Sequence, residues 1–227
     1  MRFHFLLLCL LPLLACSARA AQLLQPLIDR APAGSTLILT PGEYFGPARI
    51  TKPLTLEGRG QAIIDAGGRG TILHIQADDV TVRGLTLRNS GQSHDAIDGG
   101  IMAEGHRLRI ENNRIENALF GISLHKSEDS LIRANHIRSL PLDAADRGDG
   151  VRLWYSRHTR IENNDIAQIR DITVSNATHN RFIGNTVRQS RRALNLLFAH
   201  RTLIEGNRFE NTSTGTVALN SEGLLIR

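Results

Sequence analysis

The sequence predicts an all-β protein folded as a right-handed parallel β-helix, a solenoid with coils of about 22 residues. Three observations support this prediction. The composition favours strands and turns over helical bundles, because only 4% of the 227 residues are aromatic, 20 are Gly, and Ile, Leu, Val, Asn and Thr recur. A six-residue motif centred on Asn repeats along the chain, and a short apolar segment separates successive copies.

Each copy of the motif has an apolar residue, two variable residues, Asn, one variable residue and a second apolar residue. The Asn residues are 22, 29, 21 and 22 positions apart. This period suits one coil of a parallel β-helix, whose coils stack at about 4.8 Å. The copies are IENNRI (110–115), IRANHI (132–137), IENNDI (161–166), FIGNTV (182–187) and IEGNRF (204–209), with Asn113, Asn135, Asn164, Asn185 and Asn207 at the shared position.

These Asn residues are predicted to be structural rather than ligand-binding. Asn tolerates the left-handed backbone conformation that turns a corner between short strands. Stacked amides can also pass hydrogen bonds from coil to coil, which pairs groups that would otherwise be buried alone. The apolar segments between the copies, such as GISL (121–124) and GVRLW (150–154), supply the remaining strands of each coil.

The N-terminus predicts an exported protein. Residues 1–20 have the basic start, apolar run and small final residues of a secretory signal peptide. The alternative is a lipoprotein signal with a lipid anchor at Cys16. Residues 22–31 are amphipathic and are expected to form a short helix that caps the open end of the solenoid. Residues 22–227 are expected to be a single domain.

Charge and cysteine content narrow the partners and cofactors. Both cysteines, Cys9 and Cys16, lie in the signal segment, so no disulfide framework or thiolate metal site is expected in the rest of the chain. Without Arg2 and Arg19, 25 basic residues stand against 22 acidic ones, a formal charge of +3. Such a small and dispersed excess argues against nucleic acid as a partner.

Two connections interrupt the repeat and are about seven residues longer than the others. The count is 14 from Leu87 to Ile101 and from Ile137 to Val151, against 6 to 8 elsewhere. Both fall at the same corner, two coils apart, so they should emerge side by side about 10 Å apart as two acidic loops. Their candidate binding or docking residues are His94, Asp95 and Asp98 in 88–100, and Asp143, Asp146 and Asp149 in 138–150.

Such loops suit a cation, a sugar or a docked protein, although Asp and Gly are also ordinary turn formers in exposed loops. Arg152, Trp154 and Tyr155 follow the second loop and are candidate contact residues. Asp149 with Arg152 and Asp146 is the local set that would suit catalysis on a uronate. The metal candidates are His94, Asp95 and Asp98, together with His158 and His179, which lie 21 residues apart and are expected in adjacent coils.

The segment 39–91, from LTPGEYFG to LRNSG, together with GDGVRLWYS (148–156) and the Asn repeat, resembles the NosD family of periplasmic β-helix proteins. The resemblance extends over essentially the whole chain after the signal segment. It implies a periplasmic subunit or scaffold of an ABC-transporter assembly that matures the copper enzyme nitrous oxide reductase. The implied partners are the permease and ATPase, a copper chaperone and the reductase, with membrane association through these partners.

The resemblance also implies copper as a candidate ligand. After the signal segment the chain has no Cys and only Met102, which favours a scaffold over a tight store of Cu(I). The chain is shorter than typical members of the family, so a C-terminal truncation relative to the family is expected. The protein is predicted not to be an enzyme. The alternative is a carbohydrate-active protein on the same fold, a polyuronate lyase or epimerase.

Overall fold

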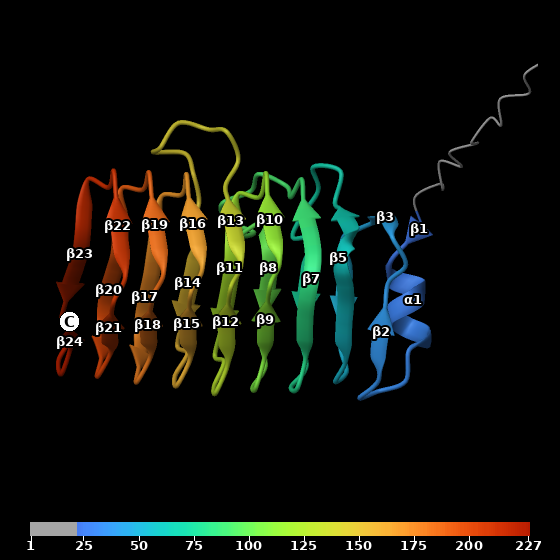
Figure 1. Ribbon diagram of the computed structural model, residues 1–227, viewed down its shortest axis with the longest axis horizontal. Coiled ribbons are helices and arrows are strands. Elements are labelled where there is room, and N and C mark those ends of the chain that lie inside the picture. The colour runs from blue at the N-terminus through green and yellow to red at the C-terminus, as the bar shows by residue number, and fades with distance from the viewer. Residues whose placement is uncertain (1–21) are drawn as a thin grey trace, which may run out of the picture.

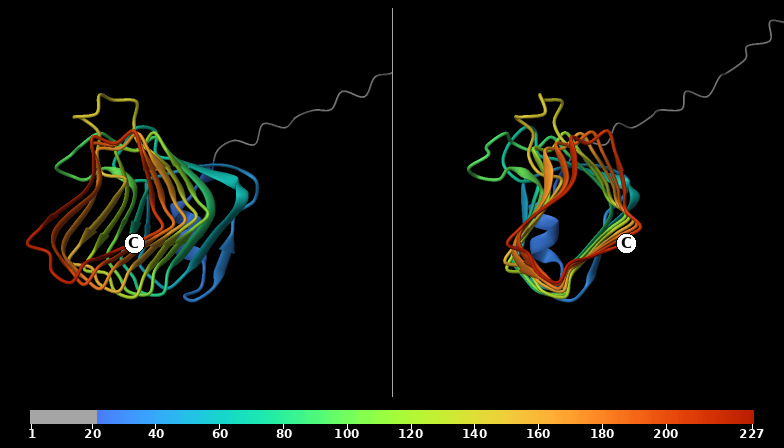
Figure 2. Two further views of the ribbon diagram at one scale, coloured as in Figure 1. Left: turned by 60° about the vertical axis from the view of Figure 1, so that its left-hand side comes forward. Right: turned by 90° about the vertical axis from the view of Figure 1, so that its left-hand side faces the viewer.

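The computed structural model describes residues 22–227, so the predicted signal peptide at 1–20 and the lipid site at Cys16 lie outside the described residues. The described chain is a parallel β-helix, as expected, and its strands stack into two sheets of 8 and 16 strands (Figure 1). Each coil has three faces, and the end view shows them enclosing one interior (Figure 2).

The 16-stranded sheet bends at the corner where the motif Asn residues lie, and it forms two of the three faces. The first face contains β2 (Thr36–Ile38), β9 (Arg109–Glu111), β12 (Leu131–Arg133), β15 (Arg160–Glu162), β18 (Arg181–Ile183), β21 (Leu203–Glu205) and β24 (Leu225–Ile226). The second face contains β1 (Gln22–Leu23), β3 (Gly42–Phe45), β10 (Arg114–Glu116), β13 (His136–Arg138), β16 (Asp165–Ala167), β19 (Thr186–Arg188) and β22 (Arg208–Glu210). The long strands β5 (Thr55–Asp65) and β7 (Thr81–Arg88) run across both faces.

The 8-stranded sheet is the third face. It contains β4 (Ala48–Ile50), β6 (Leu73–Ile75), β8 (Gly99–Ala103), β11 (Phe120–His125), β14 (Val151–Trp154), β17 (Asp171–Thr178), β20 (Arg192–His200) and β23 (Thr214–Leu219). The apolar residues of the Asn motifs and of these strands meet in one core, in which Ile132, Ile161 and Leu153 are fully buried. Alternation of inward and outward side chains along each strand therefore sets both the core and the exposed face.

The motif Asn side chains form a continuous buried ladder. From Asn113 to Asn185 each amide donates to the Asn Oδ1 of the next coil, as from Asn135 Nδ2 to Asn164 Oδ1 at 3.0 Å and from Asn164 Nδ2 to Asn185 Oδ1 at 2.9 Å. The same Oδ1 atoms also accept backbone N–H groups. For example, Asn164 Oδ1 accepts the backbone N–H of Asn135 at 2.9 Å. The ladder starts at Leu85, whose N–H donates to Asn113 Oδ1 at 3.1 Å.

The prediction that the ladder Asn residues adopt the left-handed conformation is wrong by one position. Positive φ occurs at the residue before each of them, for example 54° at Asn163 and 63° at Gly184. The reason is that one residue must turn the chain while the next points its side chain into the corner. Turning and hydrogen bonding are therefore divided between two neighbours: the turning positions are Asn112, Ala134, Asn163, Gly184 and Gly206.

One short helix, α1 (Gln25–Arg30), lies beside the first strands at the N-terminal end of the described solenoid (Figure 1). Leu24 and Ile28 are buried, at 0% and 2% exposure. That the helix caps the core remains a prediction.

Asp165 on the second face gives stability a pH dependence. Burial alone would raise the pKa of this carboxyl, but hydrogen bonds and charge from Arg138 and Arg188 hold it below its ordinary value. A lowered folded-state pKa stabilises the fold above the unfolded-state pKa, and that contribution is lost as pH falls through the folded-state pKa. We expect Asp165→Asn to reduce the free energy of unfolding by only about 1 kcal/mol at pH 7, because solvent screens these two half-buried ion pairs. The difference should vanish in acid.

Urea unfolding at several pH values measures this effect. Asp95→Asn is the control, because Asp95 is exposed and takes part in none of the ion pairs among residues 22–227. A loss for Asp165→Asn that is the same at all pH values would show that the ionic contacts of Asp165 are not its cause.

Candidate functional site

The two long loops leave the solenoid from the corner between the second and third faces and lie at one edge of the molecule (Figure 2). They touch: His94 Nε2 is 2.9 Å from the carbonyl oxygen of Asp146. The intervening coil supports both, because the His94 ring packs edge-on against Phe120 with ring centroids 5.6 Å apart. A small apolar cluster beneath them consists of Leu119, Phe120 and Leu140, with Ile97 and Leu142 packed against it.

The predicted loop carboxylates divide into two groups. Asp95, Asp143 and Asp146 are exposed, as expected. Asp98 and Asp149 are buried, at 8% and 3% exposure, so these two carboxylates do not contribute to the exposed surface of the loops. Asp98 directly precedes β8, and Asp149 lies two positions before β14, both on the third face. Asp98 Oδ2 accepts the N–H of Ser93 at 2.9 Å and so fixes the first loop.

Asp149 is held by an arginine of the next coil. Its Oδ1 accepts Arg170 Nη2 at 3.1 Å and Nε at 3.2 Å. Burial raises the pKa of Asp149, and Arg170 opposes that shift. The carboxylate of Asp171, itself paired with Arg191, raises the pKa further. Asp149 therefore supports the corner.

The set considered for uronate catalysis, Asp149 with Arg152 and Asp146, is not brought together as a unit. Asp149 pairs with Arg170, and Asp146 contributes its main-chain carbonyl to the contact with His94. Arg152 instead lies over Trp154, with its guanidinium carbon 4.7 Å from the ring centroid. Tyr155 is 55% exposed and meets Trp154 edge-on, with centroids 5.9 Å apart.

An open pocket of about 250 Å³ lies on the third face next to the first loop. Sequence reasoning found two of its residues, Arg152 and Trp154, and missed the others. The others could be found only from the register of the adjacent strands, which the sequence did not show. In that register Met102 pairs with Ser123, and Ser123 pairs with Arg152. The lining residues are Ile97, Met102, Ser123, Leu124, His125, Arg152 and Trp154.

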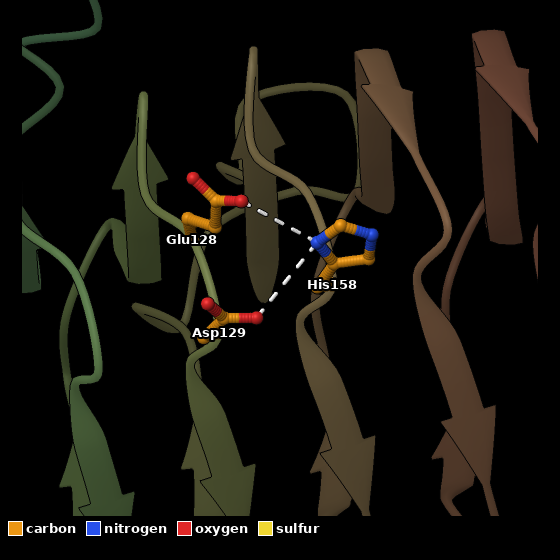
Figure 3. A group of neighbouring side chains, drawn as sticks. All are labelled: Glu128, Asp129 and His158. Atoms are coloured by element: carbon orange, nitrogen blue, oxygen red, sulfur yellow. Dashed lines mark ion pairs between the residues drawn. The ribbon is translucent and has the colours of Figure 1, made fainter.

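A separate polar group lies where the third face turns into the first (Figure 3). Nδ1 of His158 is 3.5 Å from Glu128 Oε1 and 3.8 Å from Asp129 Oδ1. The predicted neighbour His179 lies beside His158, with ring centroids 5.1 Å apart and planes at 44°. Within residues 22–227 this is the one group of three or more His, Cys, Asp or Glu residues whose ligand atoms all lie within 4.8 Å.

Carboxylate and imidazole groups suit a divalent transition metal. Here, however, Arg157 already pairs with both oxygens of Glu128, each at 2.8 Å, and its hydrogen bonds lower the pKa of that carboxyl. The contacts are those of an ion-pair cluster, and sequence reasoning did not find Glu128 or Asp129. A metal at His158 and His179, or at His94, Asp95 and Asp98, remains a prediction.

None of the helices in the described part of the chain has the length and apolar character to cross a membrane.

Comparison with known proteins identifies the family. Residues 70–227 match the family model described as "Right handed beta helix region". A protein of Stutzerimonas stutzeri named "Probable ABC transporter binding protein NosD" is 31% identical over 166 residues, which are 71% of this chain and 38% of that protein. A Pseudomonas aeruginosa protein of the same name is 35% identical over 96 residues, 87% of its length. A longer Pseudomonas aeruginosa relative of that name is 29% identical, and the chain again spans 38% of it.

Solved structures share the fold at low sequence identity. An alginate lyase from Paenibacillus aligns with a TM-score of 0.50 at 15% identity, covering 88% of this chain and 96% of the lyase. Tailspike protein 3 of bacteriophage CBA120 aligns with a TM-score of 0.52 at 13% identity, covering 85% of this chain and 35% of the tailspike. The family match, the NosD relatives and the parallel coils agree, and the chain belongs to the NosD family of right-handed parallel β-helix proteins.

Proposed function

We propose that this protein is a periplasmic accessory protein in the maturation of the copper enzyme nitrous oxide reductase. In this role it is the periplasmic subunit or scaffold of an ABC-transporter assembly. The names of the NosD relatives support a place beside an ABC transporter. The signal-like pattern of residues 1–20 supports export. Copper is cargo of the assembly in this proposal, because the described residues offer no Cys and only Met102 as soft ligands.

The observation that carries the proposal is the joined pair of loops at one edge of a rigid solenoid. The His94 contact with Asp146 and the apolar cluster around Phe120 order the loops before any partner arrives. Preordering lowers the entropy lost on binding. The exposed carboxylates of Asp95, Asp143 and Asp146 would steer a basic surface of the permease or another partner toward this edge.

We expect the triple variant Asp95→Asn, Asp143→Asn and Asp146→Asn to weaken binding to the detergent-solubilised permease–ATPase assembly by roughly 10- to 100-fold. The fold should persist, because these side chains are exposed. Surface plasmon resonance at two salt concentrations measures the loss. The variant should also show a smaller salt dependence of the association rate.

The matched control replaces three exposed acids on other surfaces, with Asp29→Asn, Asp129→Asn and Glu222→Gln, and should bind as the parent does. Equal binding by the loop variant and the control would contradict docking through the loops. A loss in both variants would indicate a general charge effect.

A carbohydrate-active role, as a polyuronate lyase or epimerase, is the second candidate, favoured by the exposed pocket beside Arg152 and Trp154. The uronate arm of the pocket experiment below distinguishes it. We also propose that α1 closes the N-terminal end of the core, since Leu24 and Ile28 are buried beside the first coil.

A further inference from the structure

The pocket on the third face holds a buried hydroxyl that nothing in the described chain explains. Ser123 is 7% exposed, and its Oγ has no hydrogen-bond partner among residues 22–227. Ser123 lies in the middle of the pocket lining, between Met102 and Arg152 in register. Since buried polar groups are nearly always paired, this hydroxyl points to a ligand.

The pocket also holds a cation without a counter-charge. Arg152 takes part in none of the ion pairs among the described residues, whereas most arginines on the other faces do. Its guanidinium lies over the Trp154 ring. Stacking uses the face of the guanidinium and leaves the N–H donors along its edge available, and those donors match a carboxylate.

Apart from His125, the rest of the pocket lining is apolar, and Ile97 of the first loop is part of it. Ile97 lines it with a φ of 55°, a conformation that β-branched residues rarely adopt. Backbone of this kind persists where surrounding contacts enforce it, and such sites cluster at ligand-binding positions. Here the contacts of the loop with the apolar cluster around Phe120 hold the Ile97 side chain, which lines the pocket together with Met102 and Trp154.

We propose that this pocket binds an extended segment of a partner protein in which an Asp or Glu carboxylate adjoins a large apolar side chain. The inference rests on the proposed docking function and names the anchor for the partner. In this complex Arg152 pairs with the carboxylate, and Ser123 forms a hydrogen bond with a polar group of the segment. The apolar side chain packs against Ile97, Met102 and Trp154.

A protein segment fits better than a sugar. The volume of about 250 Å³ is small beside the roughly 300–1,000 Å³ of small-molecule sites, and it suits the neighbouring side chains of a short peptide segment. The lining is mainly apolar, with Ile97, Met102, Leu124 and Trp154 against the polar residues Ser123, His125 and Arg152, whereas a sugar ring has a hydroxyl on most of its carbons to pair. Trp, Tyr and Arg are also the residue types that dominate the energy of protein interfaces. Trp154, Tyr155 and Arg152 lie together beside the acidic loops.

Trp154 is the one tryptophan of the sequence, so its fluorescence reports this pocket directly. The probes are the blocked peptides Ac-Gly-Phe-Glu-Gly-NH2, its Phe-Gln counterpart and its Ser-Glu counterpart, with tri-guluronate and tri-galacturonate as the sugar arm. We expect a saturable change in fluorescence with the Phe-Glu peptide. Affinity for the other two peptides should be on the order of tenfold lower, because each lacks one anchor.

Two pocket variants and one control complete the design. Arg152→Gln should lower affinity for the Phe-Glu peptide on the order of tenfold and remove the preference for Glu over Gln. Ser123→Ala should weaken binding of all three peptides without changing that preference. Arg181→Gln, an exposed arginine on the first face, should bind as the parent does.

Several outcomes would overturn the inference. The first is that no peptide gives a saturable change in fluorescence. The second is that the Phe-Glu and Phe-Gln peptides bind with equal affinity. The third is that a tri-uronate binds more tightly than the peptides, which would indicate a sugar site. Failure here is separable from failure of the proposed function. If the protein binds the permease–ATPase assembly but none of the peptides, the pocket inference is rejected and the proposed docking function is not. If the protein binds the Phe-Glu peptide but not the assembly, the proposed docking function is rejected and the pocket inference is not.

Discussion

Asn164→Ala is expected to lower the free energy of unfolding by about 4 kcal/mol, because it breaks the buried ladder in its middle. Asn164 is 1% exposed, and its side chain makes four hydrogen bonds. Its Nδ2 donates to Asn185 Oδ1 at 2.9 Å and to Ile132 O at 3.0 Å. Its Oδ1 accepts both the N–H and the Nδ2 of Asn135, at 2.9 and 3.0 Å.

The large size of the effect follows from what Ala leaves behind. The backbone N–H and one side-chain N–H of Asn135 would lose their acceptor, while Asn135 Nδ2 keeps its bond to Ile110 O, and the carbonyl of Ile132 would lose the donor Nδ2. A buried unpaired group costs about 1–3 kcal/mol. Urea unfolding followed by circular dichroism measures the change. Asn207→Ala is the matched control, because Asn207 ends the ladder and is half-buried. If the two variants lose equal stability, the loss is not due to burial of the ladder.

Gly121→Ala is expected to destabilise the protein by about 3 kcal/mol or more through steric overlap alone. A Cβ at Gly121 would lie 2.1 Å from the carbonyl oxygen of Gly150 and 2.6 Å from Ile137 Cγ2. Because the first of these atoms is backbone, relief requires β11 and β14 to separate. The strain would also displace Phe120, the adjacent residue that supports both loops.

Thermal unfolding and binding to the permease–ATPase assembly test this expectation together. We expect a lower melting temperature and weaker binding at temperatures where the variant is still folded. Gly215→Ala on β23 is the control in the same sheet, because its Cβ would meet Phe209 at an ordinary 3.6 Å. Unchanged stability of Gly121→Ala would mean that the coils can move apart without penalty at this corner.

The repeat predicted the coil because the distance between Asn residues equals the length of one turn of the solenoid. Partners such as Asn135 and Asn164 are 29 residues apart only because the second loop adds seven to the usual spacing, and they still stack. The same arithmetic placed the two loops at one corner. It placed the left-handed residues one position too late, since spacing does not distinguish the residue that turns the chain from its neighbour.

The sequence by itself determined the parallel stack, the inward and outward alternation of each strand, and the edge from which both loops emerge. These features depend on the period and on strand geometry, which are local properties of the chain. The tertiary structure alone decided that Asp98 and Asp149 turn inward, that Glu128 meets His158, and that Ser123 and Arg152 share a pocket. Asp149 and Glu128 meet residues of the neighbouring coil at corners, where packing and charge from that coil set the side-chain direction. Asp98 is held by Ser93 of its own loop, and Ser123 meets Arg152 through the register of β11 and β14. No local pattern of the sequence encodes these contacts.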